Sequence, residues 1–400
     1  MIPGAAQSDG MPVSTYKSFM LRNGGNDTDY TKFYDAFIQS VISGRNITTQ
    51  AAIPCVVYIN GEYWGPYNLQ ERYSDNHTEY KYGVNRNNVI SYDNGEIDDG
   101  LPEDGALYWD MISYKDKDLS VKSIYDTFCN IFDIQSFIDY FASQIYVNNE
   151  DWPHNNYRLW RTRTIETGNP YGDGKWRWSL FDTEYAMGIY SGGGINDPFG
   201  RVLGGDHHHN QLFKKLMTNN DFCKQFVITM MDLLNVNFHP DNVIPKLDEI
   251  ARTYSPLMEG YFERWGRPWW SVFENKVNDA KKYLNDIRPA MINNYLPGYF
   301  GKIGISAGNT AAVTLNAKNN GAIIPNASIK INTSTVKTDA GNWIGQYYSA
   351  LPVTVTAVIP DGYEFVNWTV SGGTAVSPAD TTTAVNFNGN VTITANYILK

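Results

Sequence analysis

Two aspartates and an asparagine follow one another at short intervals in the middle of the chain. Asp151 lies in a polar stretch, Asn156 comes five positions later, and Asp182 opens an acidic segment that ends at Glu184. An aspartate that can orient or deprotonate a hydroxyl, followed by an asparagine and an aspartate that can bind Mg²⁺, is the set of side chains used in kinase-type phosphoryl transfer. Hard oxygen ligands suit Mg²⁺, which also takes oxygens from nucleotide phosphates. The alternative is that Asp151 and Asn156 only bond to backbone groups of their loop.

The predicted elements around these residues explain how they could meet. Asp133 can cap an amphipathic helix that ends near Val147, and two aromatic strands are predicted for residues 157–162 and 175–181. A short loop between the helix and the first strand lets the first aspartate and the asparagine converge on one cleft. The hairpin made by the two strands then brings the second aspartate back beside them.

Two further elements are predicted nearer the start of the chain. Asp29 can cap an amphipathic helix over residues 30–43. Strands over 53–59 and 63–69 flank Asn60-Gly61, which is the strongest short-range signal for a β-hairpin.

The composition excludes several classes of protein. The formal net charge of −10 argues against a nucleic-acid partner, because no basic field is available to displace counterions from phosphates. No window approaches the roughly eighteen uninterrupted apolar residues of a transmembrane helix. Cys55, Cys129 and Cys223 are widely spaced and form no CxxC pair, so neither a disulfide framework nor a cysteine zinc site is predicted.

The composition changes near residue 302. Before it the chain is rich in Trp, Tyr and Phe, and residues 211–295 have a mostly helical pattern. After it, alternating β-branched segments are separated by turn signals such as Pro360-Asp361-Gly362. We therefore predict an α+β chain with one domain over residues 1–302 and a small all-β module over 303–400.

The histidine tract His207-His208-His209 looks like a metal-binding sequence. It lies in a Gly- and Asn-containing polar segment, and adjacent histidines are not expected to face one ion without distortion. We therefore expect a solvated loop, with weak adventitious binding of Zn²⁺ or Ni²⁺ as the main alternative. A role as part of a substrate-facing segment also stays open.

The acidic pairs Glu150–Asp151 and Asp182–Glu184 could also be compared with the acid and base of a glycosidase. Neighbouring side chains on one loop point apart, whereas a glycosidase pair must flank a bond several ångströms wide. This alternative is disfavoured.

Four segments together carry a family resemblance. In chain order they are 21–27 (LRNGGND), 58–72 (YINGEYWGPYNLQER), 151–161 (DWPHNNYRLWR) and 176–184 (WRWSLFDTE). Over roughly residues 14–298 the chain resembles the CotH family of spore-coat protein H-like atypical kinases, many of them parts of secreted bacterial proteins. The resemblance implies a divergent protein-kinase-like fold, with a partial N-lobe and a helical C-lobe. It also implies use of ATP and Mg²⁺ or Mn²⁺ to phosphorylate Ser or Thr of a protein substrate.

The resemblance also implies roles for single residues. Asp151 would be the catalytic aspartate, Asn156 and Asp182 would bind the metal, and Glu184 would assist in binding the metal. The helix around residues 33–42 would stand where protein kinases have their αC helix. The hairpin over 53–72 would lead into the hinge between the lobes, with Glu71 near the adenine or ribose.

Arg22 is a candidate for binding the nucleotide. A guanidinium group matches the geometry of phosphate oxygens. The alternative is a structural arginine that bonds to the carbonyl groups of the turn at Gly24-Gly25.

Members of the family usually open with a Gly-rich strand and a segment with Lys and Arg that would supply a nucleotide-clamping lysine. The sequence given begins after that point, and Lys17 is no obvious substitute. We expect either a piece of a longer protein, with a signal peptide upstream, or a non-catalytic relative.

The end of the chain carries a second resemblance. The segments 353–368 (VTVTAVIPDGYEFVNW) and 391–397 (VTITANY) are similar to the InlB B-repeat type of bacterial surface proteins. This resemblance implies a location outside the cell or at its surface, with a cell-envelope or extracellular partner. A secreted or surface-associated protein kinase is therefore the first hypothesis. A non-catalytic kinase-like scaffold or cell-surface binding protein is the second.

Overall fold

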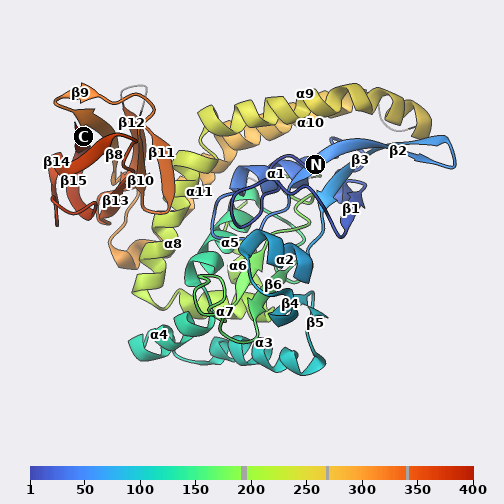
Figure 1. Cartoon of the computed structure of the whole chain (residues 1–400), viewed down its shortest axis with the longest axis horizontal. Helices are drawn as coiled ribbons and strands as arrows, with labels where there is room; N and C mark the ends of the chain where they lie inside the picture. Colours follow the sequence, from blue (N-terminus) through green and yellow to red (C-terminus); the bar gives the residue numbers. More distant parts are fainter. Residues whose placement is uncertain (191–195, 267–269, 339–341) are drawn as a thin grey trace. The chain divides into compact units, whose positions relative to one another are not determined.

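The structure is a computed structural model that describes residues 1–190, 196–266, 270–338 and 342–400 (Figure 1). The chain is α+β and divides into two compact units. The first unit comprises Met1–Asn219 and Pro240–Met291, and the second comprises Asn220–His239 and Ile292–Lys400. The first unit contains every residue predicted for the site. The predicted boundary between residues 302 and 303 stays a prediction, since the second unit also takes in a helix from the middle of the chain.

The first unit contains, in its described residues, an antiparallel sheet of three strands in the order β1-β3-β2. These are β1 (Phe19–Arg22), β3 (Glu62–Glu71) and β2 (Ala52–Ile59). The hairpin predicted at Asn60-Gly61 is confirmed, because both residues have the positive φ angles, 51° and 83°, that a tight hairpin turn needs. Arg22 lies at the end of β1, opposite Asn68 of β3.

Helix α1 (Tyr34–Ile42) begins later than the predicted start at residue 30. Lys32 has a left-handed backbone with φ of 65°, so the helix cannot extend back through it. The cap is also a different residue from the predicted Asp29. The buried carboxylate of Asp27 accepts hydrogen bonds from the backbone N–H groups of Tyr34, at 3.0 Å, and Thr31, at 2.8 Å.

A second antiparallel sheet has the order β5-β4-β6-β7. Its strands are β5 (Glu96–Asp99), β4 (Val89–Asp93), β6 (Arg158–Thr162) and β7 (Arg177–Ser179). Strands β6 and β7 confirm the two aromatic strands predicted from the sequence. Helix α5 (Ile134–Val147) precedes them, and the predicted cap is confirmed because the Asp133 carboxylate accepts from the Ser136 N–H at 3.2 Å.

A buried aromatic cluster joins α5 to strand β7 and to the loop that follows α5. The rings of Tyr140 and Trp178 stack with centroids 4.3 Å apart, and the ring of Trp152 packs edge-on against Phe141 at 4.9 Å. All four side chains are buried. The loop that carries Asp151 is therefore fixed to the core by its neighbour.

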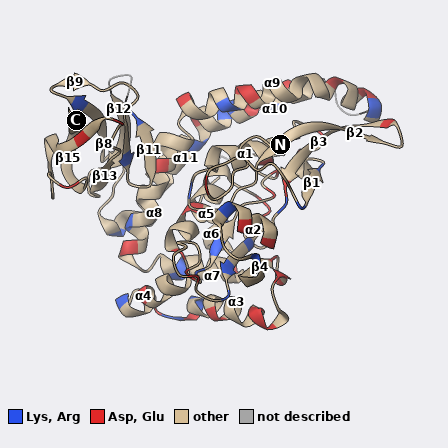
Figure 2. Ribbon diagram, viewed as in Figure 1, with Lys and Arg blue, Asp and Glu red and all other residues tan. Residues whose placement is uncertain are grey.

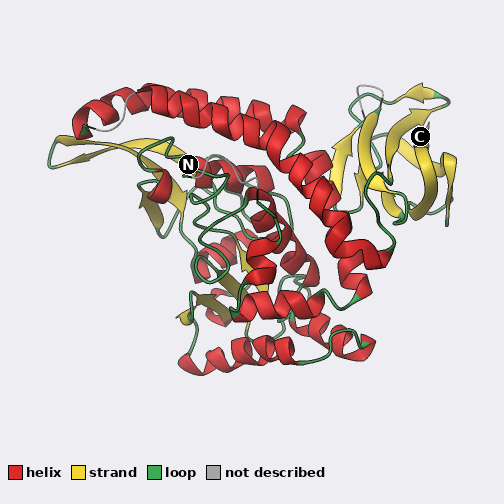
Figure 3. Cartoon of the chain, turned by 180° about the vertical axis from the view of Figure 1, so that it is seen from behind, coloured by secondary structure: helices red, strands yellow, loops and turns green. Residues whose placement is uncertain are grey.

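In the part of the chain that the structure describes, the first unit contains seven further α-helices. They are α2 (Asp75–Tyr82), α3 (Gly105–Ile112), α4 (Lys122–Ile131), α6 (Gly200–Gly204), α7 (His208–Leu216), α9 (Pro240–Trp265) and α10 (Trp270–Lys282). Helix α9 packs on strand β3 and on α10 (Figure 3), and the Tyr254 hydroxyl donates to Asn68 Oδ1 at 2.6 Å. Acidic and basic residues are interspersed along α9 (Figure 2). Among the described residues, no helix is long and apolar enough to cross a membrane.

The second unit combines two helices with a β sheet. Helix α8 (Asn220–Asp232) belongs to it, and helix α11 (Arg288–Phe300) leads into it. The sheet order is β11-β10-β13-β15-β8-β12, with β14 paired to β15 and β9 to β8. The strands are β8 (Thr310–Asn319), β9 (Ala322–Ile323), β10 (Ser328–Ile331), β11 (Ser334–Lys337), β12 (Trp343–Tyr348), β13 (Val353–Ala357), β14 (Tyr363–Ala375) and β15 (Thr382–Leu399). The predicted all-β character of the tail is thus confirmed.

Asp232, at the end of α8, is bound by the turn between β10 and β11 and by strand β12 of its unit. Its buried carboxylate accepts from the Asn332 amide at 3.0 Å, the Thr333 N–H at 2.9 Å and the Tyr347 hydroxyl at 2.9 Å. A fully buried carboxylate is tolerated only when such donors surround it. The helix and the sheet of this unit therefore depend on each other.

The carboxylate that caps α1 generates a prediction about pH. Burial raises the pKa of Asp27 to about 6 from an ordinary value of 3.8, against the hydrogen bonds from Thr31 and Tyr34 that lower it. Between these values the folded chain holds a proton that the unfolded chain has released, so the stability contributed by this group falls as pH rises. The Asp27→Asn variant lacks this titration. We expect the stability of the parent protein relative to the variant to fall by roughly 3 kcal/mol between about pH 3.5 and pH 7.

Urea unfolding followed by tryptophan fluorescence at a series of pH values measures this difference. Asp116→Asn, at an exposed carboxylate, is the matched control and is expected to keep the pH dependence of the parent. Parallel pH profiles for the parent and Asp27→Asn would contradict the prediction.

Candidate functional site

The loop between helix α5 and strand β6 carries two of the predicted site residues. Asn148 ends α5 in the left-handed conformation with φ of 52°, and Asn156 has the same conformation with φ of 56° just before β6 begins. Asp182 follows strand β7 and is also left-handed, with φ of 55°. Asparagine and aspartate tolerate this backbone better than other residues with side chains. The polar residues at these positions are thus also the ones that the turns require.

The structure brings Asp151, Asn156 and Asp182 together, as predicted from the sequence. The Asn156 side-chain amide donates to Asp151 Oδ2 at 3.2 Å and to the backbone carbonyl of Asp182 at 3.3 Å. The amide of Asn149 also donates to that carbonyl, at 3.4 Å. Since the nitrogen of Asn156 faces two acceptors, its Oδ1 oxygen is the atom that can bind a metal ion.

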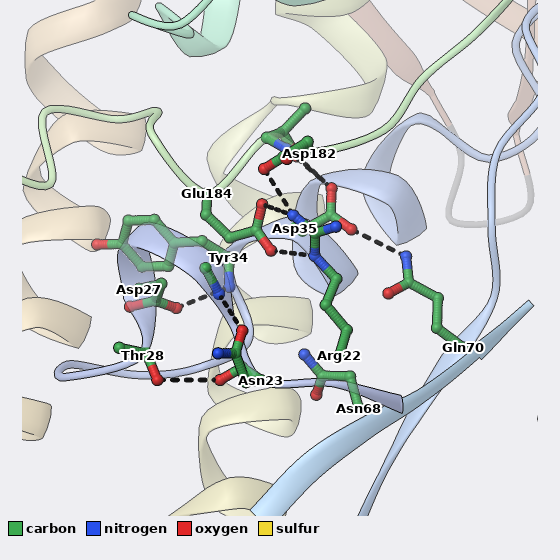
Figure 4. A network of polar contacts seen from close by, with 12 residues as sticks. Arg22, Asn23, Asp27, Thr28, Tyr34, Asp35, Asn68, Gln70, Asp182 and Glu184 are labelled. Carbon is green, nitrogen blue, oxygen red and sulfur yellow. Dashed lines mark hydrogen bonds and ion pairs between the residues drawn. The ribbon is translucent and has the colours of Figure 1, made fainter. Parts of the chain in front are cut away.

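Arg22 forms ion pairs with both carboxylates of the acidic turn (Figure 4). Its guanidinium lies 2.6 Å from Asp182 Oδ1 and donates to Glu184 Oε2 at 2.7 Å. These bonds join strand β1 to a turn 160 residues later in the chain. In the described contacts the guanidinium bonds to carboxylates and not to the carbonyl groups of Gly24 and Gly25, which was the alternative predicted role.

The two acids of the turn differ in their protonation. Burial raises the pKa of Glu184 well above its usual range, and the Asp35 carboxylate and the hydrogen bond with Asp182 raise it further. Burial also opposes ionisation of Asp182, but its bonds with Glu184 and Arg22 outweigh burial and lower its pKa. The Asp182 side chain is 29% exposed and that of Glu184 only 1%. Asp182 is therefore the more readily ionised and the more exposed acid of the pair, and it can reach a cation from solvent.

Asp35 of helix α1 holds the acidic turn from the other side. Its buried carboxylate accepts from the backbone N–H of Thr183 at 3.0 Å and from the Thr183 hydroxyl at 2.8 Å, and Gln70 of β3 donates to it at 2.9 Å (Figure 4). Asp35 thus connects α1, β3 and the turn. Sequence reasoning missed it, although an aspartate within the apolar pattern of the predicted helix was a signal of a buried polar role.

Glu71 forms its side-chain hydrogen bonds with other residues than these. Its buried carboxylate accepts from the Ala51 N–H at 2.7 Å and from the Tyr80 hydroxyl at 2.6 Å. Both oxygens therefore bond to the protein itself, and contact of Glu71 with adenine or ribose stays a prediction.

A cavity of about 220 Å³ lies beside the acidic turn. Its lining includes Arg22, Arg72, Asp93, Arg158 and Phe181, the residue that precedes Asp182. A larger hollow of about 800 Å³, lined by residues such as Lys81 and Asn169, contains none of the predicted site residues. The smaller cavity is thus the one that adjoins the candidate chemistry.

The histidine tract differs from the predicted solvated loop. His208 begins helix α7, and the side chain of His209 is fully buried. The tract was expected to be solvated because its flanking residues are polar, but its rings pack against Tyr108 and Tyr157.

Comparison with known protein families places these residues in context. Residues 4–291 match the family described as CotH kinase protein. The chain belongs to this family. Residues 311–400 match the family described as divergent InlB B-repeat domain. A comparison with curated proteins finds none that matches the sequence.

For this member of the CotH kinase family, both resemblances inferred from the sequence are confirmed. The match spans the loop of Asp151 and Asn156, the acidic turn and the strand of Arg22. The roles of the individual residues were inferred from motifs, and the geometry brings the three central ones to one place.

The ion pair of Arg22 generates a stability prediction. Arg22→Met leaves the buried Glu184 without its cation, and removing one partner of a buried pair costs about 3 kcal/mol in free energy of unfolding. The double variant Arg22→Met/Glu184→Gln removes both members of the buried pair and leaves only the partly exposed Asp182 without its cation, so it is expected to lose less. Urea unfolding measures both values.

Lys122→Met is the control for this comparison, because Lys122 pairs with Asp126 on an exposed helix surface. It is expected to change stability by less than about 0.5 kcal/mol. The prediction fails if the single and double variants are equally stable.

Proposed function

We propose that this chain is a surface-associated or secreted protein kinase that transfers the γ-phosphoryl group of ATP to a Ser or Thr hydroxyl of a protein substrate. The observation that carries the proposal is the position of the Asn156 amide, within 3.3 Å of both the Asp151 carboxylate and the Asp182 backbone. These contacts bring the loop of the proposed base next to the turn of the proposed metal-binding aspartate. Phosphoryl transfer needs this convergence, since its catalysis consists mostly of positioning and charge stabilisation.

Asp151 is the proposed base. Its Oδ1 accepts from the Asn155 amide at 3.2 Å and its Oδ2 from Asn156, and these two bonds orient the carboxylate. In the proposed step the acceptor hydroxyl gives its proton to Asp151 while its oxygen forms a bond to the γ-phosphorus. The bond from that phosphorus to the β–γ bridging oxygen breaks, and ADP leaves.

Asp182 and Asn156 fit a divalent cation. Asp182 is the more readily ionised and more exposed acid of its turn. Asn156 Oδ1 is directed away from the two acceptors that hold its nitrogen. Both are hard oxygen donors of the kind that Mg²⁺ or Mn²⁺ takes. Glu184 is proposed to assist through its hydrogen bond with Asp182. When bound, the cation would neutralise charge on the nucleotide phosphates.

Arg22 is proposed to bind phosphate. In the structure its guanidinium neutralises the same carboxylates that would hold the cation. When a nucleotide binds, Arg22 could pair with its phosphate groups in place of the carboxylates. This exchange of partners would free Asp182 to bind the cation. We therefore expect the nucleotide and the divalent cation to bind together rather than one after the other.

The cavity beside the acidic turn is the proposed place for part of the nucleotide. Ligand pockets usually measure about 300–1,000 Å³, so a cavity of about 220 Å³ takes only part of ATP. Contact of Glu71 with the base or ribose is proposed on the family resemblance alone and requires Glu71 to exchange its bond with Tyr80.

A second candidate is a non-catalytic kinase-like binding protein. The ion pairs of Arg22 favour it, because they satisfy the acidic turn without any ligand. The B-repeat match supports a surface or extracellular location for either candidate. A protein substrate or partner of the cell envelope is accordingly proposed, and the net charge of −10 disfavours a nucleic-acid partner.

The test is a phosphotransfer assay on the full chain with labelled ATP and Mg²⁺ or Mn²⁺, with the chain itself and casein as acceptors. Asp151→Asn is expected to lower the rate by at least about 100-fold, the usual contribution of a general base. Asp182→Asn is expected to lower the rate strongly and to raise the concentration of divalent cation needed for the remaining activity. Asp116→Asn, the surface control, is expected to keep the parent rate.

Labelling that survives both site substitutions would overturn the mechanism. ATP binding without transfer, measured by calorimetry with Mg²⁺ present, or no ATP binding at all, would favour the non-catalytic candidate.

A further inference from the structure

Three histidine rings lie together at the start of helix α7. The ring centroids of His207, His208 and His209 are 3.8, 4.3 and 4.8 Å apart in pairs. One potential ligand atom from each ring lies within 4.8 Å of those of the other two. Adjacent histidines thus face one point, contrary to the expectation from the sequence.

The backbone explains this convergence. His207 is extended, with φ of −59° and ψ of 148°, and precedes the helix that His208 begins. In a continuous helix the side chains of three successive residues would diverge. The change from extended to helical backbone between His207 and His208 turns them to one side instead. The backbone at the start of α7 therefore has the irregular conformation that three adjacent ligands require.

The Tyr108 hydroxyl completes the cluster. Its oxygen lies 2.6 Å from His208 Nε2 and 2.8 Å from His209 Nε2. The hydroxyl has one proton, so one of these rings accepts from it and the other donates to it. The Nδ1 atom of His207 is buried and has no hydrogen-bond partner. An unpaired polar atom of this kind is costly unless a ligand satisfies it.

The rings lie against one another and are buried or half-buried. Burial lowers the pKa of all three imidazoles, that of His208 to about 4. A neutral imidazole offers the lone pair of one ring nitrogen to a metal ion.

We propose that His207, His208 and His209 form a Zn²⁺ site, with the Tyr108 oxygen as the fourth donor. Imidazole is a preferred ligand of Zn²⁺, which is bound by four donors in a tetrahedron. Bonds of 2.0–2.1 Å place tetrahedral ligands about 3.3 Å apart. The rings reach this separation by rotating toward the ion. The site is chemically distinct from the oxygen donors at Asp182, and the proposal does not depend on phosphoryl transfer.

The ion would fix the base of the Asp151 loop. The His209 ring packs edge-on against Tyr157 with centroids 4.5 Å apart and against Trp178 at 5.1 Å. Tyr157 directly follows Asn156 in the chain. Zinc bound to His209 would therefore hold in place the aromatic residues on which the loop rests.

The test uses the full chain purified without a histidine tag and stripped of metal with a chelator. Calorimetric titration with ZnCl₂ is expected to give one tight site per chain that excess Mg²⁺ does not displace. His207→Ala and His208→Ala are each expected to weaken binding by at least about 100-fold, and Tyr108→Phe by about 10-fold. His239→Ala is the control and is expected to keep the affinity and stoichiometry of the parent.

The variants were chosen to keep the fold. His207 and His208 are partly exposed, whereas His209 is fully buried. Circular dichroism checks that each variant is folded. Titration with Co²⁺ in place of Zn²⁺ gives a second readout, since its visible absorption reports tetrahedral coordination. Absence of Zn²⁺ binding by the parent, or unchanged binding in folded His207→Ala and His208→Ala, would overturn the proposal.

Discussion

The structure around the acidic turn depends on how the negative charges of its carboxylates are compensated. Asp35, Asp182 and Glu184 are three acids within one small region, and Arg22 is the cation that meets two of them. Asp35 is stabilised instead by neutral donors, Thr183 and Gln70. Because a buried carboxylate requires donors or a counter-charge, strand β1, helix α1 and the turn can each take their places only when the others are present.

The aromatic cluster supplies the second support of the site. Tyr140 and Trp178 stack in the core, and Trp152 extends this packing into the loop directly after Asp151. The His209 ring packs edge-on against Trp178. The loop is therefore held by apolar contacts beneath it and by amide hydrogen bonds at its polar end, so that a short irregular segment gains the rigidity that positioning of a reactive group requires.

Local signals in the sequence predicted local structure well. Asn60-Gly61 specifies its hairpin and Asp133 its helix, because turn and cap chemistry operates within a few residues. The meeting of Asp151, Asn156 and Asp182 followed from the order of helix, loop and hairpin. The partners of Arg22 could not be predicted, since they lie 160 and 162 positions away. The replacement of Asp29 by Asp27 as the cap, and the convergence of the histidine rings, depend on single backbone angles that no residue pattern specifies.

The bonds of Asp232 bear on how such chains evolve. Helix α8 lies within the stretch that matches the kinase family, yet its terminal carboxylate is held by Asn332, Thr333 and Tyr347 of the β sheet. The B-repeat of this chain is consequently not a module that could be exchanged freely for another. A module recruited in its place would have to bring amide and hydroxyl donors to the same acid, so the two families have become joined by a shared helix and would be expected to be inherited as a pair.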